Sequence, residues 1–169
     1  MQGIHMLRYP VIFASMVTKG CVESGKSVQQ GGAKYSTAGL YITGAANLAD
    51  SIAAIEKCVY EDKDITMDEL IHALDHNFEG EERMRQLLLN KPEKFGNDEA
   101  HVDGIYREMM HFIAEHVQQW EDARGGLYSF NVHSQTVNVS HGAVCGATPD
   151  GRLAGEPFCD NASPMMGRD

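Results

Sequence analysis

The sequence has no closely spaced pair of cysteines. Its four cysteines, Cys21, Cys58, Cys145 and Cys159, stand far apart, a spacing that favours reduced thiols over a disulfide framework or a zinc site. The chain also lacks an apolar run long enough to cross a bilayer. Residues 1–9 lack the basic start, apolar stretch and cleavage site of a secretory signal. We therefore expect a cytoplasmic protein with no membrane partner.

Basic residues are also in short supply. Lys and Arg total 14 against 24 Asp and Glu, which gives a net charge of −10. Such a chain repels phosphate backbones, so we expect no nucleic-acid partner. Hydrophobic residues are 43% and charged residues 22% of the chain, close to ordinary globular usage. The composition therefore argues against disorder throughout and leaves the function open.

Helical patterns are more frequent than strand patterns. Apolar residues recur at helical spacing in five stretches, residues 10–25, 45–59, 66–80, 84–91 and 102–120. Thr66 and Glu69 stand at the spacing of a capping box, which predicts the start of the third helix. Strands are expected at residues 35–42 and 128–140, and in the second the alternation changes phase at residues 134–136, as at a bulge.

This set of elements indicates that packing partners are missing. Two strands cannot form an independently stable sheet. The tail from Gly142 onward holds five of the 17 glycines and three of the five prolines, with no clear element. Such a length of irregular chain is uncommon unless it is functional or packs on something else. We therefore interpret the 169 residues as an interior piece of a longer protein.

Several short motifs occur in order along the chain. They are Cys21-Val-Glu-Ser-Gly25, Gly31-Gly-Ala-Lys-Tyr35, Ala46-Asn-Leu-Ala-Asp-Ser-Ile-Ala-Ala-Ile55, Phe78-Glu-Gly80, Gly96-Asn-Asp98, Gly146-Ala-Thr-Pro-Asp-Gly-Arg-Leu-Ala-Gly-Glu-Pro157 and Ser163-Pro-Met-Met-Gly-Arg-Asp169. In this order they resemble the C-terminal half of the large domain of glycyl radical enzymes, the pyruvate formate-lyase family. The resemblance covers essentially the whole chain.

The resemblance implies an α/β fold, a ten-stranded barrel of which this piece is mostly helical with about two strands. It also implies that the parent enzyme carries a glycyl radical, installed by an activating enzyme that uses S-adenosylmethionine and an iron–sulfur cluster. The radical oxidises a cysteine inside the barrel, and the resulting thiyl radical abstracts hydrogen from a small polar substrate. We expect a homodimer for the complete enzyme and no cofactor bound within this piece.

Cys21-Val22-Glu23 looks like the catalytic Cys-x-Glu of the dehydratase-like members, but we assign Cys21 a structural role. The family places its thiyl loop well upstream of the GGA block, whereas Cys21 lies ten residues before Gly31. Cys21 also follows Val17 by one helical turn on an apolar face, where free cysteine behaves as a small hydrophobe. The Arg-Val-x-Gly-Tyr motif of the radical glycine is absent. Residues 1–169 are thus expected to be part of a pyruvate formate-lyase-type domain without the catalytic cysteine loop and the C-terminal glycine radical domain, and inactive alone.

Residues 132–140 are the best candidates for substrate contact. A strand buried in a barrel should be mostly apolar, yet this stretch is mostly polar, and buried polar groups need partners. A polar ligand would supply them. An edge strand with one wet face, or bonds to protein outside this chain, are the open alternatives. In the family this strand lines the barrel, and the substrate-binding candidates are His133, Ser134 and Gln135.

Two further patterns have ordinary interpretations. His72 and His76 stand four apart on one helical stripe and could share a metal, but a solvated stripe is favoured and no metal site is expected. The 146–157 loop lacks the Lys-Ser/Thr end of a phosphate-binding loop. Asp150 and Arg152 are instead expected to be turn and anchoring residues, with the intervening glycine at positive φ.

The leading hypothesis is a fragment of a glycyl radical lyase that cleaves a C–C, C–O or C–N bond through thiyl hydrogen abstraction. The dehydratase-like branch is favoured, because the block at residues 146–157 resembles that branch more closely. Formate C-acetyltransferase, that is pyruvate formate-lyase, is the alternative enzyme. An inactive scaffold or interaction module is the alternative from another class.

Overall fold

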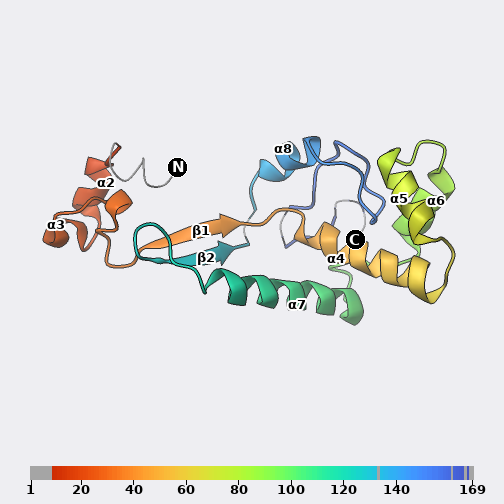
Figure 1. Ribbon diagram of the computed structural model, residues 1–169, viewed down its shortest axis with the longest axis horizontal. Coiled ribbons are helices and arrows are strands. Elements are labelled where there is room, and N and C mark those ends of the chain that lie inside the picture. Colours follow the sequence, from red (N-terminus) through yellow and green to blue (C-terminus); the bar gives the residue numbers. More distant parts are fainter. Residues whose placement is uncertain (1–8, 133, 161, 166, 168–169) are drawn as a thin grey trace. The chain divides into compact units, whose positions relative to one another are not determined.

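The computed structural model describes residues 9–132, 134–160, 162–165 and 167 (Figure 1). In these ranges helices predominate, and two strands form one sheet. The chain divides into two compact units, Met1–Leu40 with His111–Asn131, and Tyr41–Met110 with Val132–Asp169. None of the helices in the described ranges is long and apolar enough to cross a membrane.

The first unit begins with two short helices, α2 (Ile12–Val17) and α3 (Cys21–Ser24). The single helix expected at residues 10–25 was wrong. The helix is interrupted between Thr18, which is extended, and Gly20, whose φ is +100°. A Cβ at Gly20 would lie 2.7 Å from the backbone nitrogen of Lys34, so the close approach of two segments requires glycine at the break.

A 3-10 turn, η1 (Val28–Gln30), precedes β1 (Thr37–Tyr41), which confirms the extended segment expected at residues 35–42. β1 pairs with β2 (Leu127–Asn131), and Figure 1 shows the two strands running in the same direction. Parallel neighbours need a long crossover connection. Residues 42–126, most of the helical part of the chain, provide it.

The long helix α7 (Ala100–Val117) ends before Trp120, earlier than the sequence predicted. A turn held by Asp122 follows it. The Asp122 carboxylate is 5% exposed and accepts bonds from the N–H groups of Arg124 and Gly126, at 2.8 and 3.0 Å, and from Arg124 Nε at 2.8 Å. Burial alone would raise the pKa of Asp122, but these bonds hold it below its ordinary value.

The second unit is helical. Its elements are α4 (Ala45–Ile55), a π-helical turn η2 (Glu56–Glu61), α5 (Met67–Asp75), α6 (Glu82–Asn90), the start of α7, and α8 (Val137–Ala143). One core cluster joins α4, η2, α5 and α6, with buried members Ala54, Cys58, Ile65, Leu70, Ala73, Phe78 and Leu88. A second cluster, of Ala49, Ala53 and Val102, joins α4 to α7. α4 packs through an alanine face, whereas Leu48, part of the apolar pattern, is 49% exposed.

Local sequence signals are reproduced at α5. Glu69 N donates to Thr66 Oγ1 at 3.3 Å, and Thr66 N donates to Glu69 Oε2 at 2.7 Å, so the expected capping box is confirmed. The helix ends before Gly80, because Asn77 and Phe78 already adopt positive φ angles of 53° and 57°. The start of this helix was therefore predictable, and its end was not.

The strand expected at residues 128–140 ends with β2, and residues 137–143 form α8 instead. The change of phase at residues 134–136 therefore marks the end of the strand and not a bulge within it. α8 is held by the loop that follows it. Asn138 Nδ2 donates to Phe158 O at 3.0 Å, and Phe158 N donates to Asn138 O at 3.3 Å. These tertiary contacts override the alternating pattern.

Candidate functional site

Residues 148–152, which we call the TPDGR turn, form a tight and buried turn. The Thr148 hydroxyl donates to Asp150 Oδ1 at 2.5 Å, and Thr148 N donates to Arg152 O at 3.0 Å. Gly151 has a φ of +88°, as predicted for a Pro-Asp-Gly turn. Asp150 and Arg152 are 0% exposed. Their expected role as turn and anchoring residues is confirmed.

The guanidinium of Arg152 is bonded within its own loop. It donates to four oxygens, those of the Leu153 (3.0 Å), Glu156 (2.6 Å) and Gly146 carbonyls and the Thr148 hydroxyl (3.2 Å). Its Cζ also lies 4.3 Å from the centre of the Phe158 ring, in a cation–π contact. A buried charge needs such partners. Arg152 therefore anchors the loop instead of offering a site for a phosphate or carboxylate.

A polar stripe on α4 holds this loop, which Figure 1 shows beside the helix. Asn47 Nδ2 donates to Asp150 Oδ2 at 2.8 Å, and Asn47 Oδ1 accepts from Cys159 N at 2.7 Å. One turn further, Asp50 Oδ1 accepts from Phe95 N at 2.7 Å. Asn47 and Asp50 are 2% and 1% exposed. Sequence reasoning missed both, although two polar residues three apart in an alanine-rich helix were the available signal.

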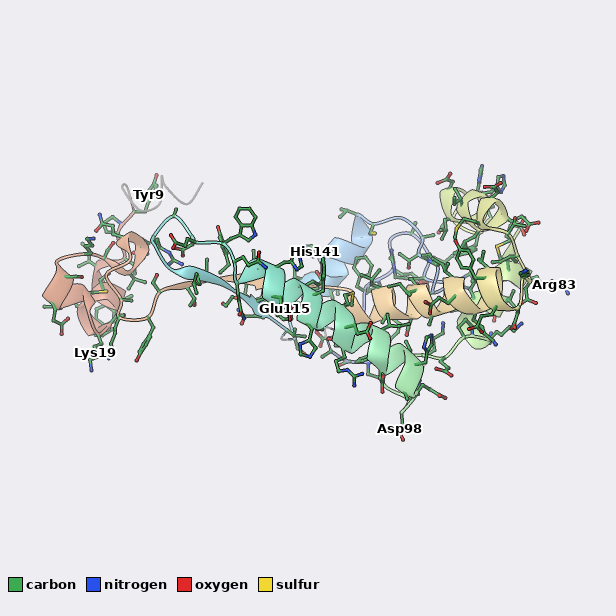
Figure 2. All side chains as sticks on the ribbon, turned by 60° about the horizontal axis from the view of Figure 1, so that its bottom comes forward. Tyr9, Lys19, Arg83, Asp98, Glu115 and His141 are labelled. Atoms are coloured by element: carbon green, nitrogen blue, oxygen red, sulfur yellow. The ribbon has the colours of Figure 1, made fainter. Side chains whose placement is uncertain are left out.

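The predicted substrate residues lie between β2 and α8. Ser134 and Gln135 are exposed, and His133 lies outside the described residues. A shallow hollow of the surface is lined by Gln135, Thr136, Val137, Val139 and Ser140. Further along α8, Figure 2 labels His141, whose Nδ1 lies 2.7 Å from the Thr43 hydroxyl. Ser134 and Gln135 are thus chain neighbours in an open segment without strand structure.

The thiols and histidines show no reactive cluster in the described ranges. Cys21, Cys58 and Cys159 are 3%, 0% and 2% exposed, and none of the four cysteines, all of them among the described residues, forms a disulfide. Burial raises the pKa of the Cys58 and Cys159 thiols, which keeps both protonated at neutral pH. The exposed rings of His72 and His76 stack with centres 4.2 Å apart. Among the residues searched, no three His, Cys, Asp or Glu side chains gather as metal ligands.

Comparison with known proteins identifies the family of this chain. A sequence model described as pyruvate formate lyase-like matches residues 1–142. This chain belongs to the pyruvate formate lyase-like family. Its relatives include the trans-4-hydroxy-L-proline dehydratase of Clostridioides difficile, 36% identical over 160 residues, and the probable dehydratase YbiW of Escherichia coli (strain K12), 37% identical over 166 residues. These alignments cover 95% and 94% of this chain and 20% of each relative.

Solved structures of the family extend the match to the fold. The glycerol-bound, B12-independent glycerol dehydratase from Clostridium butyricum matches with a TM-score of 0.91 and 38% identity, over 99% of this chain and 21% of that protein. A protein of 1,2-propanediol dehydration in Roseburia inulinivorans matches with a TM-score of 0.92 and 38% identity, over 99% and 22%. The chain thus spans about one fifth of the length of these relatives. The predicted fold class, a mostly helical piece of their α/β fold with two strands, is confirmed.

Proposed function

We propose that residues 1–169 are part of a glycyl radical lyase, in a pyruvate formate-lyase-type domain whose catalytic cysteine loop and radical glycine lie elsewhere in the parent protein. The observation that carries this proposal is the structural match over 99% of the chain. It extends to the glycerol, 1,2-propanediol and trans-4-hydroxy-L-proline dehydrating proteins, with TM-scores of 0.91, 0.92 and 0.92.

Dehydration of a small polar substrate is the reaction that the relatives favour. The dehydratases of Clostridioides difficile and Escherichia coli align with 95% and 94% of this chain. The isethionate sulfite-lyase of Bilophila wadsworthia aligns with 75%. Dehydratases are thus among the relatives that align with most of this chain, which supports cleavage of a C–O bond. The fold alone does not choose the bond, so the reaction has to be tested directly.

Within this chain we assign substrate contact to Ser134 and Gln135, with His133 beside them in sequence. The exposure of these two polar side chains in the segment after β2 supports the assignment. We assign Cys21 a structural role, which its burial supports. The parent's glycyl radical, installed by an activating enzyme with S-adenosylmethionine and an iron–sulfur cluster, supplies the hydrogen-abstracting thiyl radical. No glycine of this chain fits that role, because none stands in an Arg-Val-x-Gly-Tyr motif.

The rest of the parent protein is the partner that the apolar surface of α2 requires. Phe13, Met16 and Val17 are 80%, 68% and 72% exposed, and contiguous apolar patches of this kind mark contact surfaces. The relatives are about five times as long as this chain, which leaves ample polypeptide to cover it. We further propose a homodimer in the cytoplasm, where the four free cysteines remain reduced.

A segment exchange tests the proposal. Residues 1–169 replace the matching segment of the 1,2-propanediol-dehydrating protein from Roseburia inulinivorans. The activated hybrid is examined for a glycyl radical by electron paramagnetic resonance and for turnover of 1,2-propanediol, glycerol and trans-4-hydroxy-L-proline. A radical signal with dehydration of at least one of these substrates is the expected result.

The other outcomes separate the alternatives. A radical without dehydration of any of these substrates would show that the segment fits the fold but that the parent is not of the dehydratase branch. Formation of acetyl-CoA from pyruvate and coenzyme A by the activated parent protein itself would then identify a formate C-acetyltransferase. Failure of the hybrid to form a radical, while the unaltered Roseburia protein forms one, would indicate a scaffold or interaction module.

A further inference from the structure

Phe158 connects the TPDGR turn to α8. Its ring lies 4.3 Å below the Arg152 guanidinium carbon. The ring also lies against Gly44, where an added Cβ would come 3.0 Å from Phe158 Cδ1. The backbone of Phe158 is bonded in both directions to Asn138, at 3.3 Å through its N–H and at 3.0 Å through its carbonyl oxygen. The buried turn therefore reaches the first turn of α8 through one residue.

α8 depends on these contacts for its position. It has seven residues and no side-chain bond at its N-terminal cap, and a helix of this length is not stable alone. Its other end is fixed by Gly142, where a Cβ would overlap the carbonyl oxygen of Glu156. The hydrogen bond between Thr43 and His141 adds a contact on the same side. Both ends of α8 are thus held by the loop that follows it, and the second end also by Thr43.

We propose that Asn138 and Phe158 are positioning residues for the substrate segment 134–136. Their paired hydrogen bonds fix the start of α8, and Ser134 and Gln135 directly precede that start. Arg152 contacts the Phe158 ring and so ties the segment to the buried TPDGR turn. The claim that residues 134–136 contact substrate rests on the function proposed above. The claim that Asn138 and Phe158 fix the start of α8 rests on these contacts alone.

Hydrogen–deuterium exchange in the natural full-length protein tests the link. Asn138→Ala removes the side-chain bond to Phe158, and Phe158→Leu removes the ring contact but keeps both backbone bonds. Both variants are expected to speed amide exchange of residues 134–143 by about tenfold or more, while exchange in α5 and α6 stays unchanged. Asn90→Ala is the matched control, because it removes an asparagine bond to a backbone carbonyl, that of Gln86, elsewhere in the second unit.

Steady-state kinetics of the activated protein tests the consequence for substrate. A displaced contact segment should raise KM by on the order of tenfold with a smaller change in kcat, because the lost contacts bind the substrate and the transition state alike. Unchanged exchange in residues 134–143, a uniform rise across the second unit, or an equal effect of Asn90→Ala would overturn the positioning role. Absence of turnover in the unaltered protein would overturn the proposed function, and the exchange result would still decide the positioning role.

Discussion

The TPDGR turn and helix α2 depart from the usual distribution of side chains in opposite ways. At the turn, Asp150 and Arg152 are fully buried, whereas Phe13 on α2 is 80% exposed. Charged residues are almost never fully buried unless they are paired, and here the loop and α4 supply the partners. A large exposed apolar face marks a contact surface. We infer that the charged groups of the TPDGR turn find their partners within the second unit, whereas the apolar side chains of α2 need a surface from the rest of the protein to cover them.

The two regions also differ in what holds their backbone. α2 has six residues, no buried side chain and no side-chain bond at its cap. The TPDGR turn is irregular chain, yet hydrogen bonds from distant residues fix it, from Asn47 to Asp150 at 2.8 Å and from Arg85 Nε to the Gly151 carbonyl at 3.0 Å. Regular secondary structure is therefore a poor guide to rigidity in this chain, and long-range contacts are a better one.

Replacing Arg152 should have the largest effect on stability. Arg152→Met keeps much of the volume but removes the donors of three carbonyl oxygens and a hydroxyl in a buried loop. We expect a loss of about 3–5 kcal/mol in the free energy of unfolding, measured by denaturant titration of the full-length protein. Arg107→Met on exposed α7 surface is the control and should stay within about 0.5 kcal/mol. Equal midpoints for the two variants would refute the anchoring role.

Two glycines of the same loop allow the cost of steric overlap to be separated from the cost of backbone strain. Gly151 and Gly155 have similar φ angles, +88° and +82°. A Cβ at Gly151 would lie 2.7 Å from Leu89 Cγ, whereas a Cβ at Gly155 has nothing within 4 Å. Gly155→Ala should cost about 1 kcal/mol of backbone strain, and Gly151→Ala about 2–4 kcal/mol, because overpacking adds to the strain.

The control for this pair is the Leu89→Ala background, in which the added methyl group finds space. There the difference between the two alanine variants should shrink, as read from thermal melts of the same protein. A difference that persists in that background would show that the backbone at Gly151, and not its contact with Leu89, sets the cost.

Features that depend on nearby residues were predicted correctly from the sequence, whereas features that depend on contacts between separate segments were not. The capping box of Thr66 and Glu69 and the positive φ of Gly151 depend on neighbours within a few residues, and both were predicted correctly. The break at Gly20 depends on the approach of Lys34, and α8 depends on the contact of Asn138 with Phe158. A pattern within one segment does not contain such contacts, so one helix was expected where there are two, and a strand where there is a helix.

A charged substitution on α2 tests whether the rest of the protein covers the apolar surface of this helix. In the full-length protein, Phe13→Glu should cost about 2 kcal/mol, close to the transfer free energy of a buried aromatic side chain. In the isolated 169-residue chain it should change stability by less than about 0.5 kcal/mol, because Phe13 is already exposed there. Binding of a hydrophobic dye to the isolated chain should fall. Equal costs in both settings would show that no further protein covers α2.

The capping box of α5 gives the smallest expected effect and shows how an exposed polar contact compares with the buried turn. Bonds from the Thr66 N–H and hydroxyl hold the pKa of Glu69 below its ordinary value. The stabilisation of α5 by the ionised Glu69 is therefore fully present above the ordinary pKa of a glutamate, and it is lost as pH falls through the lowered pKa of Glu69. Glu69→Gln should remove this dependence, so that the Thr66 amide resonance no longer shifts between neutral and acidic pH. An unaltered acid shift of Thr66 in the variant would show that another group is responsible.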